Sequence, residues 1–208
     1  MTEEQPVVYV VDDDPSVREA LERLLRSANY DAKTFTSAAG FLDFSLPDAP
    51  GCLLLDIRMP ELSGLDLQDR LAEQGVSLPV IFVTAHGTVA RTVKAFKAGA
   101  VDFLQKPFEE TDLLDAVSRA VERHRRLRQG QREIGVLQAR LDTLTPRERE
   151  VFALVVSGML NKQIAFDLGT AEKTIKVHRA RVMEKMGAQS LSDLVRFAEK
   201  LGSRASPG

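Results

Sequence analysis

The stretch Val7-Val8-Tyr9-Val10-Val11-Asp12-Asp13-Asp14 joins an apolar run to three consecutive carboxylates, and it decides the fold of the first half of the chain. Three further apolar runs lead into polar residues: Cys52-Leu53-Leu54-Leu55, Val80-Ile81-Phe82-Val83 and Val101-Asp102-Phe103-Leu104. Short runs of this kind predict buried strands of a parallel sheet, and ligands bind beyond the carboxyl ends of such strands. We therefore expect five polar residues to gather at one sheet edge: Asp12, Asp13, Asp56, Thr84 and Lys106.

Helix-period segments alternate with these runs. Residues 15–27 place apolar side chains at helical spacing, Ser63-Gly64 opens another helix, Gly99 ends a third, and Thr111-Asp112 begins the last. The pattern gives about five strand-helix units within residues 5–122. The sequence therefore predicts a doubly wound α/β domain.

The two halves of the chain carry opposite charge. Residues 1–122 contain 11 Lys and Arg against 21 Asp and Glu, a net charge of −10, whereas residues 123–208 contain 17 against 9, a net charge of +8. The acidic half suits cations, and the basic half suits the phosphates of nucleic acid or of an anionic membrane. Cys52 is the only cysteine, and no apolar stretch reaches the ~20 residues that span a bilayer. We expect a cytoplasmic protein without a membrane segment.

From Thr145 onward the pattern is purely helical. Thr145-Pro146-Arg147-Glu148 predicts a capping box with proline at the first helical position. We expect Asn161 to cap a second helix, Gly169 to make a turn, and Thr170 to cap a third helix that ends near Met186. This is a helix-turn-helix pattern within a four-helix domain at residues 144–201.

Residues 123–143 connect the two domains. Leu127, Ile134 and Leu141 are spaced by seven, as are Leu137 and Leu144, which favours a helical linker with a short coiled-coil seam. Gly130 and Gly135 each cost about 1 kcal/mol in a helix interior, so a basic, partly flexible linker containing a solvated His124 remains an alternative. The sequence leaves open whether this segment dimerises.

The acidic edge has a chemistry of its own. Clustered carboxylates repel one another, and a divalent cation such as Mg²⁺ relieves the repulsion while taking oxygen ligands. Asp13 and Asp56 are the ligand candidates, with Asp12 beside them. A carboxylate can also attack a phosphoryl group, whose developing charge a lysine and a hydroxyl stabilise. Lys106 and Thr84 supply those two groups.

The helix after Gly169 has one apolar face and one cationic face. Ile175, Val182, Met183 and Met186 form the expected inner stripe, whereas Val177 is an apolar residue on the outward face. An exposed valine among cations suits the DNA major groove, where a thymine methyl offers an apolar contact. The other outward residues are Lys173, Lys176, Ala180, Arg181 and Glu184.

Four motifs in order resemble the receiver domain of two-component response regulators: Val11-Asp12-Asp13-Asp14, Asp56-Ile57-Arg58-Met59-Pro60 with Ser63-Gly64, Thr84-Ala85, and Lys106-Pro107-Phe108. The resemblance implies a flavodoxin-like fold with Asp56 as the phosphoacceptor. It also implies Mg²⁺ bound by Asp12, Asp13, Asp56 and the Arg58 carbonyl, and phosphoryl contacts from Thr84 and Lys106. It further implies that Thr84 and Phe103 form a switch and that the peptide bond between Lys106 and Pro107 is cis. Composition alone favours Phe103 as plain core and His86 as an exposed loop histidine.

Residues from about Leu144 to Leu201 resemble the four-helix DNA-binding domain of the LuxR, NarL and FixJ regulators, through Leu144 to Glu150, Asn161 to Ala165 and Lys173 to His178. The resemblance implies base contacts from Lys176, Val177 and Ala180, although some relatives carry lysine at position 180. It also implies phosphate contacts from Lys162, Lys173 and Arg181, and an inward-facing His178.

Together these features predict a transcription factor that accepts a phosphoryl group on Asp56 from a sensor histidine kinase. Promoter DNA and RNA polymerase are the expected partners, with homodimerisation on phosphorylation. Three alternatives were weighed. A haloacid-dehalogenase-type phosphohydrolase requires a second aspartate at the position that Arg58 occupies here. A flavodoxin-like redox protein requires a hydroxyl-rich loop at the position of Asp12-Asp13-Asp14. A regulator controlled by protein contacts alone is disfavoured by the complete acidic set.

Overall fold

The computed structural model describes residues 4–85 and 89–202, without the side chains of residues 89–91 and 94. The chain divides into two compact units, Met1–Arg128 and Gln129–Gly208, which are described in turn. Among the described residues, no helix combines the length and apolarity that a membrane crossing requires.

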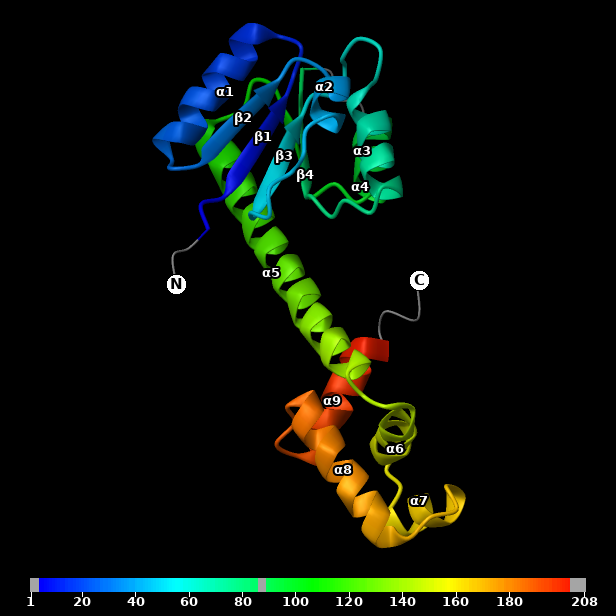
Figure 1. The fold of residues 1–208 in the computed structure, drawn as a ribbon. Helices are drawn as coiled ribbons and strands as arrows, with labels where there is room; N and C mark the ends of the chain where they lie inside the picture. Colours follow the sequence, from blue (N-terminus) through cyan, green and yellow to red (C-terminus); the bar gives the residue numbers. More distant parts are fainter. Residues whose placement is uncertain (1–3, 86–88, 203–208) are drawn as a thin grey trace. The chain divides into compact units, whose positions relative to one another are not determined.

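Five parallel strands form one sheet in the first unit, in the order β2-β1-β3-β4-β5 (Figure 1). The order reverses beside β1, which lies between β2 and β3 as expected for a doubly wound α/β fold. This topology confirms the predicted fold class. The strands are β1 Val7–Val11, β2 Asp31–Phe35, β3 Gly51–Leu55, β4 Val80–Thr84 and β5 Asp102–Gln105.

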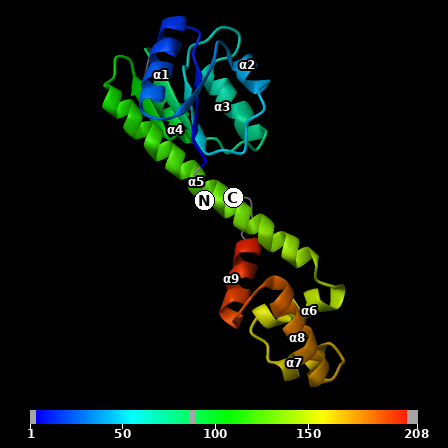
Figure 2. The ribbon, with the colours of Figure 1, turned by 60° about the vertical axis from the view of Figure 1, so that its left-hand side comes forward.

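Helices cover both faces of this sheet (Figure 2). Alternate residues of each central strand point to opposite faces, so that Tyr9 and Phe82 belong to one core and Val10 and Ile81 to the other. The first core is closed by α2, α3 and α4, and the second by α1 and α5. The helices are α1 Pro15–Ser27, α2 Ala38–Leu42, α3 Gly64–Glu73, α4 Val89–Lys97 and α5 Glu110–Asp142.

The second unit is helical, as predicted. It contains α6 Pro146–Val156, α7 Asn161–Asp167, α8 Glu172–Met186 and α9 Leu191–Gly202, packed around a separate core. The capping box of Thr145 and Glu148 is present at the start of α6. The two caps expected at Asn161 and Thr170 are each wrong by one residue, because Leu160 and Ala171 hold the cap positions. Neither Leu160 nor Ala171 has a side-chain oxygen, so the polar neighbour misled the prediction.

Helix α5 is continuous through Gly130 and Gly135, so the linker is helical in this structure. The spacing of its leucines has an explanation within the chain. Leu137 and Leu144 are buried, and Leu141 packs against the core of the second unit. Heptad spacing here therefore serves intramolecular packing in part.

His124 was expected to be solvated, but the structure buries it in part. It is half-buried, and its Nδ1 accepts a hydrogen bond from the backbone N–H of Gly51 at 2.9 Å. Burial is the largest cause that lowers the pKa of His124, and the nearby positive charge of Arg128 lowers it further. The neutral imidazole therefore ties α5 to the start of β3.

Candidate functional sites

The carboxyl ends of the sheet bring the five predicted residues together. Asp12 and Asp56 follow Val11 and Leu55, which are paired in register, and the backbone N–H of Asp56 donates to Val11 at 2.9 Å. Thr84 ends β4, and the N–H of Lys106 donates to its carbonyl oxygen at 2.9 Å. The parallel register of the strands thus fixes the neighbourhood of the pocket.

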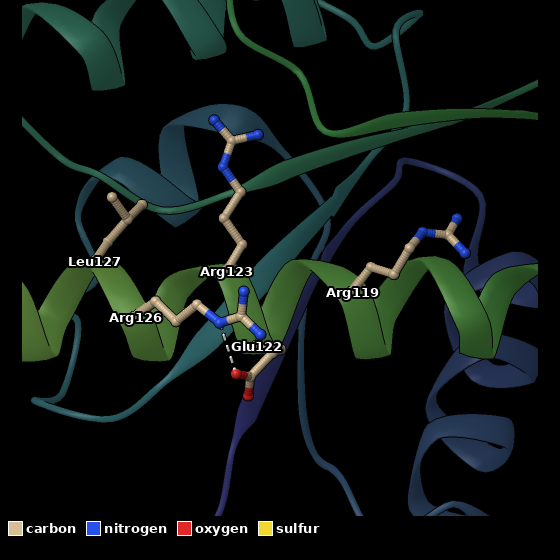
Figure 3. A pocket seen from close by; sticks show the side chains of 5 residues that line it. All are labelled: Arg119, Glu122, Arg123, Arg126 and Leu127. Atoms are coloured by element: carbon tan, nitrogen blue, oxygen red, sulfur yellow. Dashed lines mark hydrogen bonds and ion pairs between the residues drawn. The ribbon is translucent and has the colours of Figure 1, made fainter.

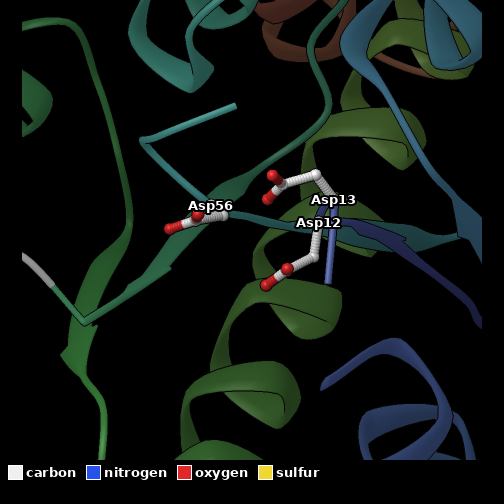
Figure 4. Close-up of side chains that lie close together, drawn as sticks. All are labelled: Asp12, Asp13 and Asp56. Carbon is white, nitrogen blue, oxygen red and sulfur yellow. The ribbon is translucent and has the colours of Figure 1, made fainter. Parts of the chain in front are cut away.

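Three carboxylates cluster at this edge of the sheet (Figure 4). One oxygen each of Asp12, Asp13 and Asp56 lies within 4.8 Å of the other two. Asp12 is 2% exposed, Asp56 is half-buried, and Asp13 is open to solvent. Oxygen ligands in a cluster of this kind, with one of them accessible, fit a hard divalent cation.

Asp12 is the most firmly held carboxylate. Lys106 Nζ lies 2.6 Å from its Oδ2, and the backbone N–H of Asp14 donates to its Oδ1 at 2.9 Å. Arg18, in α1, donates to the backbone carbonyl of Asp12 at 2.7 Å. The only sequence signal of Arg18 is its place in the first helix after the acidic triplet.

Asp56 lies in an environment that disfavours its charge. Burial is the largest cause that raises its pKa, and the charge of Asp12 raises it too. A hydrogen bond with Thr84 and the ammonium group of Lys106 oppose that shift without cancelling it. A cation or a cationic side chain beside Asp56 therefore stabilises its ionised, nucleophilic form.

Gly64 fixes the backbone behind Asp56. A Cβ at position 64 would lie 2.1 Å from the carbonyl oxygen of Asp56, which leaves no space for a side chain. The N–H of Gly64 donates to the carbonyl of Ile57 at 3.0 Å. The motif Ser63-Gly64 marks this position in the sequence, whereas only the structure shows the close backbone approach that demands glycine.

The remaining receiver predictions have different outcomes. The peptide bond between Lys106 and Pro107 is cis, as expected. Phe103 is half-buried against the core beside Phe82, with ring centroids 6.5 Å apart, and its role as a switch stays a prediction. The side chain of Arg58 is exposed, and the role of its carbonyl stays a prediction. His86 lies outside the described residues.

A hollow lies along α5, and all the side chains that line it come from this helix (Figure 3). It has a volume of about 420 Å³ and is lined by Arg119, Glu122, Arg123, Arg126 and Leu127. Arg119 pairs with Asp102 at 2.6 Å, and Arg126 pairs with Glu122 at 2.9 Å. Because carboxylates already engage two of these guanidinium groups, the hollow resembles a solvated helix face more than a reactive site.

All six residues predicted to contact DNA are exposed in the second unit: Lys162, Lys173, Lys176, Val177, Ala180 and Arg181. The inner stripe of α8 is packed in the core, with Ile175, Val182 and Met186 all buried. Val177 is 46% exposed, as its outward position predicts. Helix α8 thus presents one apolar residue among cations.

Buried polar contacts hold the helices of this unit. Glu148 is 2% exposed, and its carboxylate lies 2.6 Å from Lys185 Nζ. The hydrogen bond from Lys185 is the largest cause that lowers the pKa of Glu148, to about 2. His178 is half-buried, in line with its expected inward side, and its Nδ1 has no hydrogen-bond partner within the described ranges.

Comparison with known proteins gives both units a class. Residues 8–118 match the response regulator receiver domain, and residues 142–198 match the bacterial regulatory proteins of the luxR family. The chain is 48% identical to Nodulation protein W of Bradyrhizobium diazoefficiens, over 96% of this chain and 88% of that protein. It is 43% identical to the transcriptional regulatory protein FixJ of Rhizobium meliloti, over 92% of this chain and 94% of that protein.

Solved structures agree with this class. The structure of the response regulator StyR is 47% identical and has a TM-score of 0.85, with 94% of this chain and 99% of that chain covered. Full-length FixJ from B. japonicum is 39% identical with a TM-score of 0.57, and the match covers 98% of this chain and 99% of that chain.

The chain therefore belongs to the response regulators that join a receiver domain to a LuxR-type DNA-binding domain. It is a transcriptional response regulator, and members of this family are DNA-binding regulators. A receiver domain implies a histidine kinase as partner, and receiver domains typically bind Mg²⁺ through acidic residues such as the cluster seen here.

Proposed function

We propose that Asp56 accepts a phosphoryl group from the phosphohistidine of a sensor kinase. A carboxylate oxygen of Asp56 attacks phosphorus, the phosphorus–nitrogen bond breaks, and its electron pair stays on the imidazole. The convergence of three carboxylates with Thr84 and Lys106 at one sheet edge carries this proposal. The products are an aspartyl phosphate on this chain and the free histidine of the kinase.

The neighbours of Asp56 have distinct proposed roles. Mg²⁺ would be held by Asp12, Asp13, Asp56 and the Arg58 carbonyl. When bound, it would neutralise charge on the transferring phosphoryl oxygens. Lys106 leaves Asp12 to contact the phosphoryl group, and the Thr84 hydroxyl donates to another of its oxygens. Thr84 would then move together with Phe103, which biases the receiver between two states.

The proposed output is DNA binding by the second unit. We assign residues 5–122 to the receiver, 123–143 to the linker and 144–201 to the DNA-binding domain. In this proposal Lys176, Val177 and Ala180 contact bases, whereas Lys162, Lys173 and Arg181 contact phosphates. Phosphorylation favours a homodimer that binds paired half-sites and engages RNA polymerase. Because chromosomal DNA is the proposed partner, the proposed site of action is the cytoplasm.

Labelling with a small phosphoryl donor tests the proposal. Full-length protein incubated with radiolabelled acetyl phosphate should incorporate label only when Mg²⁺ is present. Asp56→Asn should reduce the incorporation to background, because an amide is not a nucleophile of this kind. Asp69→Asn provides the matched control, since Asp69 is an exposed carboxylate on α3. Persistent labelling of the Asp56→Asn protein would refute the assignment.

A further inference from the structure

We propose that Phe166, on α7, packs against the deoxyribose rings of bound DNA and is a contact outside the recognition helix α8. This inference rests on the DNA-binding function proposed above. The side chain of Phe166 is 87% exposed, more than any other large apolar side chain in the described residues. A phenylalanine ring in water offers apolar surface whose burial against a partner would be favourable.

Helix α7, which carries Phe166, is held in place by core packing and by hydrogen bonds near both of its ends. Its Ile164 and Ala165 are packed in the core of the second unit. At one end of the helix, Arg179 of α8 donates to the side-chain oxygen of Asn161 at 3.1 Å. At the other end, Arg147 of α6 donates to the carbonyl of Leu168 at 2.6 Å. The face that carries Phe166 therefore has a set orientation relative to α8.

The surroundings of Phe166 favour a polyanion as the covering partner. Lys162 lies one helical turn earlier on the same face, and both side chains are exposed. Lys173, Lys176 and Arg181 are also exposed on the neighbouring α8 (Figure 1). Asp167 is exposed beside Phe166, but successive helical residues point about 100° apart, so it need not face the same partner.

The docking geometry of helix-turn-helix proteins indicates which part of the DNA Phe166 would contact. In helix-turn-helix proteins the first helix crosses the DNA backbone while the second enters the major groove. An exposed face of α7 would then meet sugars and phosphates, where Lys162 neutralises a phosphate and the uncharged ring covers sugar carbons. Such a contact adds affinity and carries no direct sequence information.

The salt dependence of DNA affinity tests this contact. The full chain, phosphorylated with acetyl phosphate, would be titrated against a duplex that it has selected from a random library. We expect Phe166→Ala to raise Kd roughly tenfold at every salt concentration, because apolar surface is lost without any charge. The slope of log Kd against log salt should stay unchanged. Lys162→Ala should instead decrease that slope by about 0.9, the value for one phosphate contact.

Matched variants make each outcome decisive. Val136→Ala removes another exposed apolar side chain of the same unit, 53% exposed, and should leave Kd unchanged. Phe166→Leu should recover part of the affinity. Unfolding midpoints should not move for Phe166→Ala, because the ring is exposed.

Two results would overturn the inference. Equal Kd values for Phe166→Ala and the unsubstituted protein would do so. This holds even if the variant supports less transcription by RNA polymerase, because the ring would then contact the polymerase and not DNA. If the unsubstituted protein selects no duplex from the library, the DNA-binding proposal is overturned as well. Failure of the DNA-binding proposal is thereby distinguished from failure of the Phe166 contact alone.

Discussion

The acidic pocket and the DNA-facing surface use opposite ways of presenting polar groups. The acidic site is assembled from four strand ends, and two of its three carboxylates, Asp12 and Asp56, are buried or half-buried and accept hydrogen bonds from backbone N–H groups. The surface of α7 and α8 carries exposed side chains, whose positions depend on polar contacts beneath them such as that of Glu148 with Lys185. Geometry limits the chemistry of the first region, whereas the second depends on a stable platform.

The largest expected effect comes from closing the space behind Asp56. Gly64→Ala would place a methyl group 2.1 Å from the Asp56 carbonyl oxygen, so the backbone of the pocket must shift. We expect the first unit to lose about 1–3 kcal/mol of stability and phosphoryl incorporation to fall at least tenfold. Urea unfolding and acetyl phosphate labelling would measure the two effects.

The same substitution in an open helix provides the control. Gly130→Ala, where an added Cβ meets no atom of the described structure within 4 Å, should be neutral or stabilising by up to about 1 kcal/mol. Full labelling activity in Gly64→Ala would show that the pocket tolerates displacement, and would break the contrast between the two regions.

A smaller effect is expected when the platform of the second unit is weakened. Glu148→Gln removes the charge that Lys185 and the cap at Thr145 stabilise, and should lower the unfolding midpoint of this unit by roughly 5–10 °C. DNA affinity at low temperature should change little. Calorimetry and a binding titration on the same sample would separate stability from recognition, and a large loss of affinity in a folded variant would contradict this division.

Acid should act on the platform in the same direction. Because the pKa of Glu148 is lowered in the folded state to about 2 from an ordinary 4.5, its stabilising contribution is complete above pH 4.5 and is lost as pH falls toward 2. The Glu148→Gln unit should lack that part of the acid dependence. Unfolding midpoints of both proteins between pH 5 and pH 3 would test this, and parallel curves would count against the role given to Glu148.

The smallest structural effect, with a clear functional one, is expected on the exposed face of α8. Lys176→Ala removes an exposed cation that pairs with Glu172 at 3.2 Å, so unfolding should change by less than about 0.5 kcal/mol. If Lys176 contacts a base, affinity should fall about 5- to 150-fold and sequence preference should relax at one position. Selection of DNA from a random library by both proteins would reveal a uniform loss instead if Lys176 contacts only phosphate.

The sequence was informative where burial and periodicity agree. The run Val7 to Val11 and residues 15–27 give β1 and α1 with the bounds seen in the structure, and the polar strand ends gave the pocket. Strand β2, Asp31–Phe35, has no such apolar run, because Ala32 is the one buried residue among its five. Periodicity is weak in such an edge strand.

Other features depend on contacts between distant residues. Nothing local distinguishes a solvated His124 from one that accepts a hydrogen bond from Gly51, 73 residues away. Leucines spaced by seven in α5 and just after it could equally serve a partner chain or the core of their own unit. Leu137 in α5 and Leu144 beyond its end are both buried within the chain. The exposure of Phe166 is equally invisible in α7, where Ile164, Ala165 and Phe166 form one apolar run and only the first two are buried.

The most direct measurement is the chemical identity of the residue that carries the phosphoryl group. The full chain would be phosphorylated with acetyl phosphate and Mg²⁺, reduced with borohydride to trap the acyl phosphate, and mapped by peptide mass spectrometry. Our account predicts a single modified side chain, Asp56, and no modification when Mg²⁺ is removed. Modification of Asp12 or Asp13 instead, or of no aspartate at all, would contradict the proposed role of the pocket.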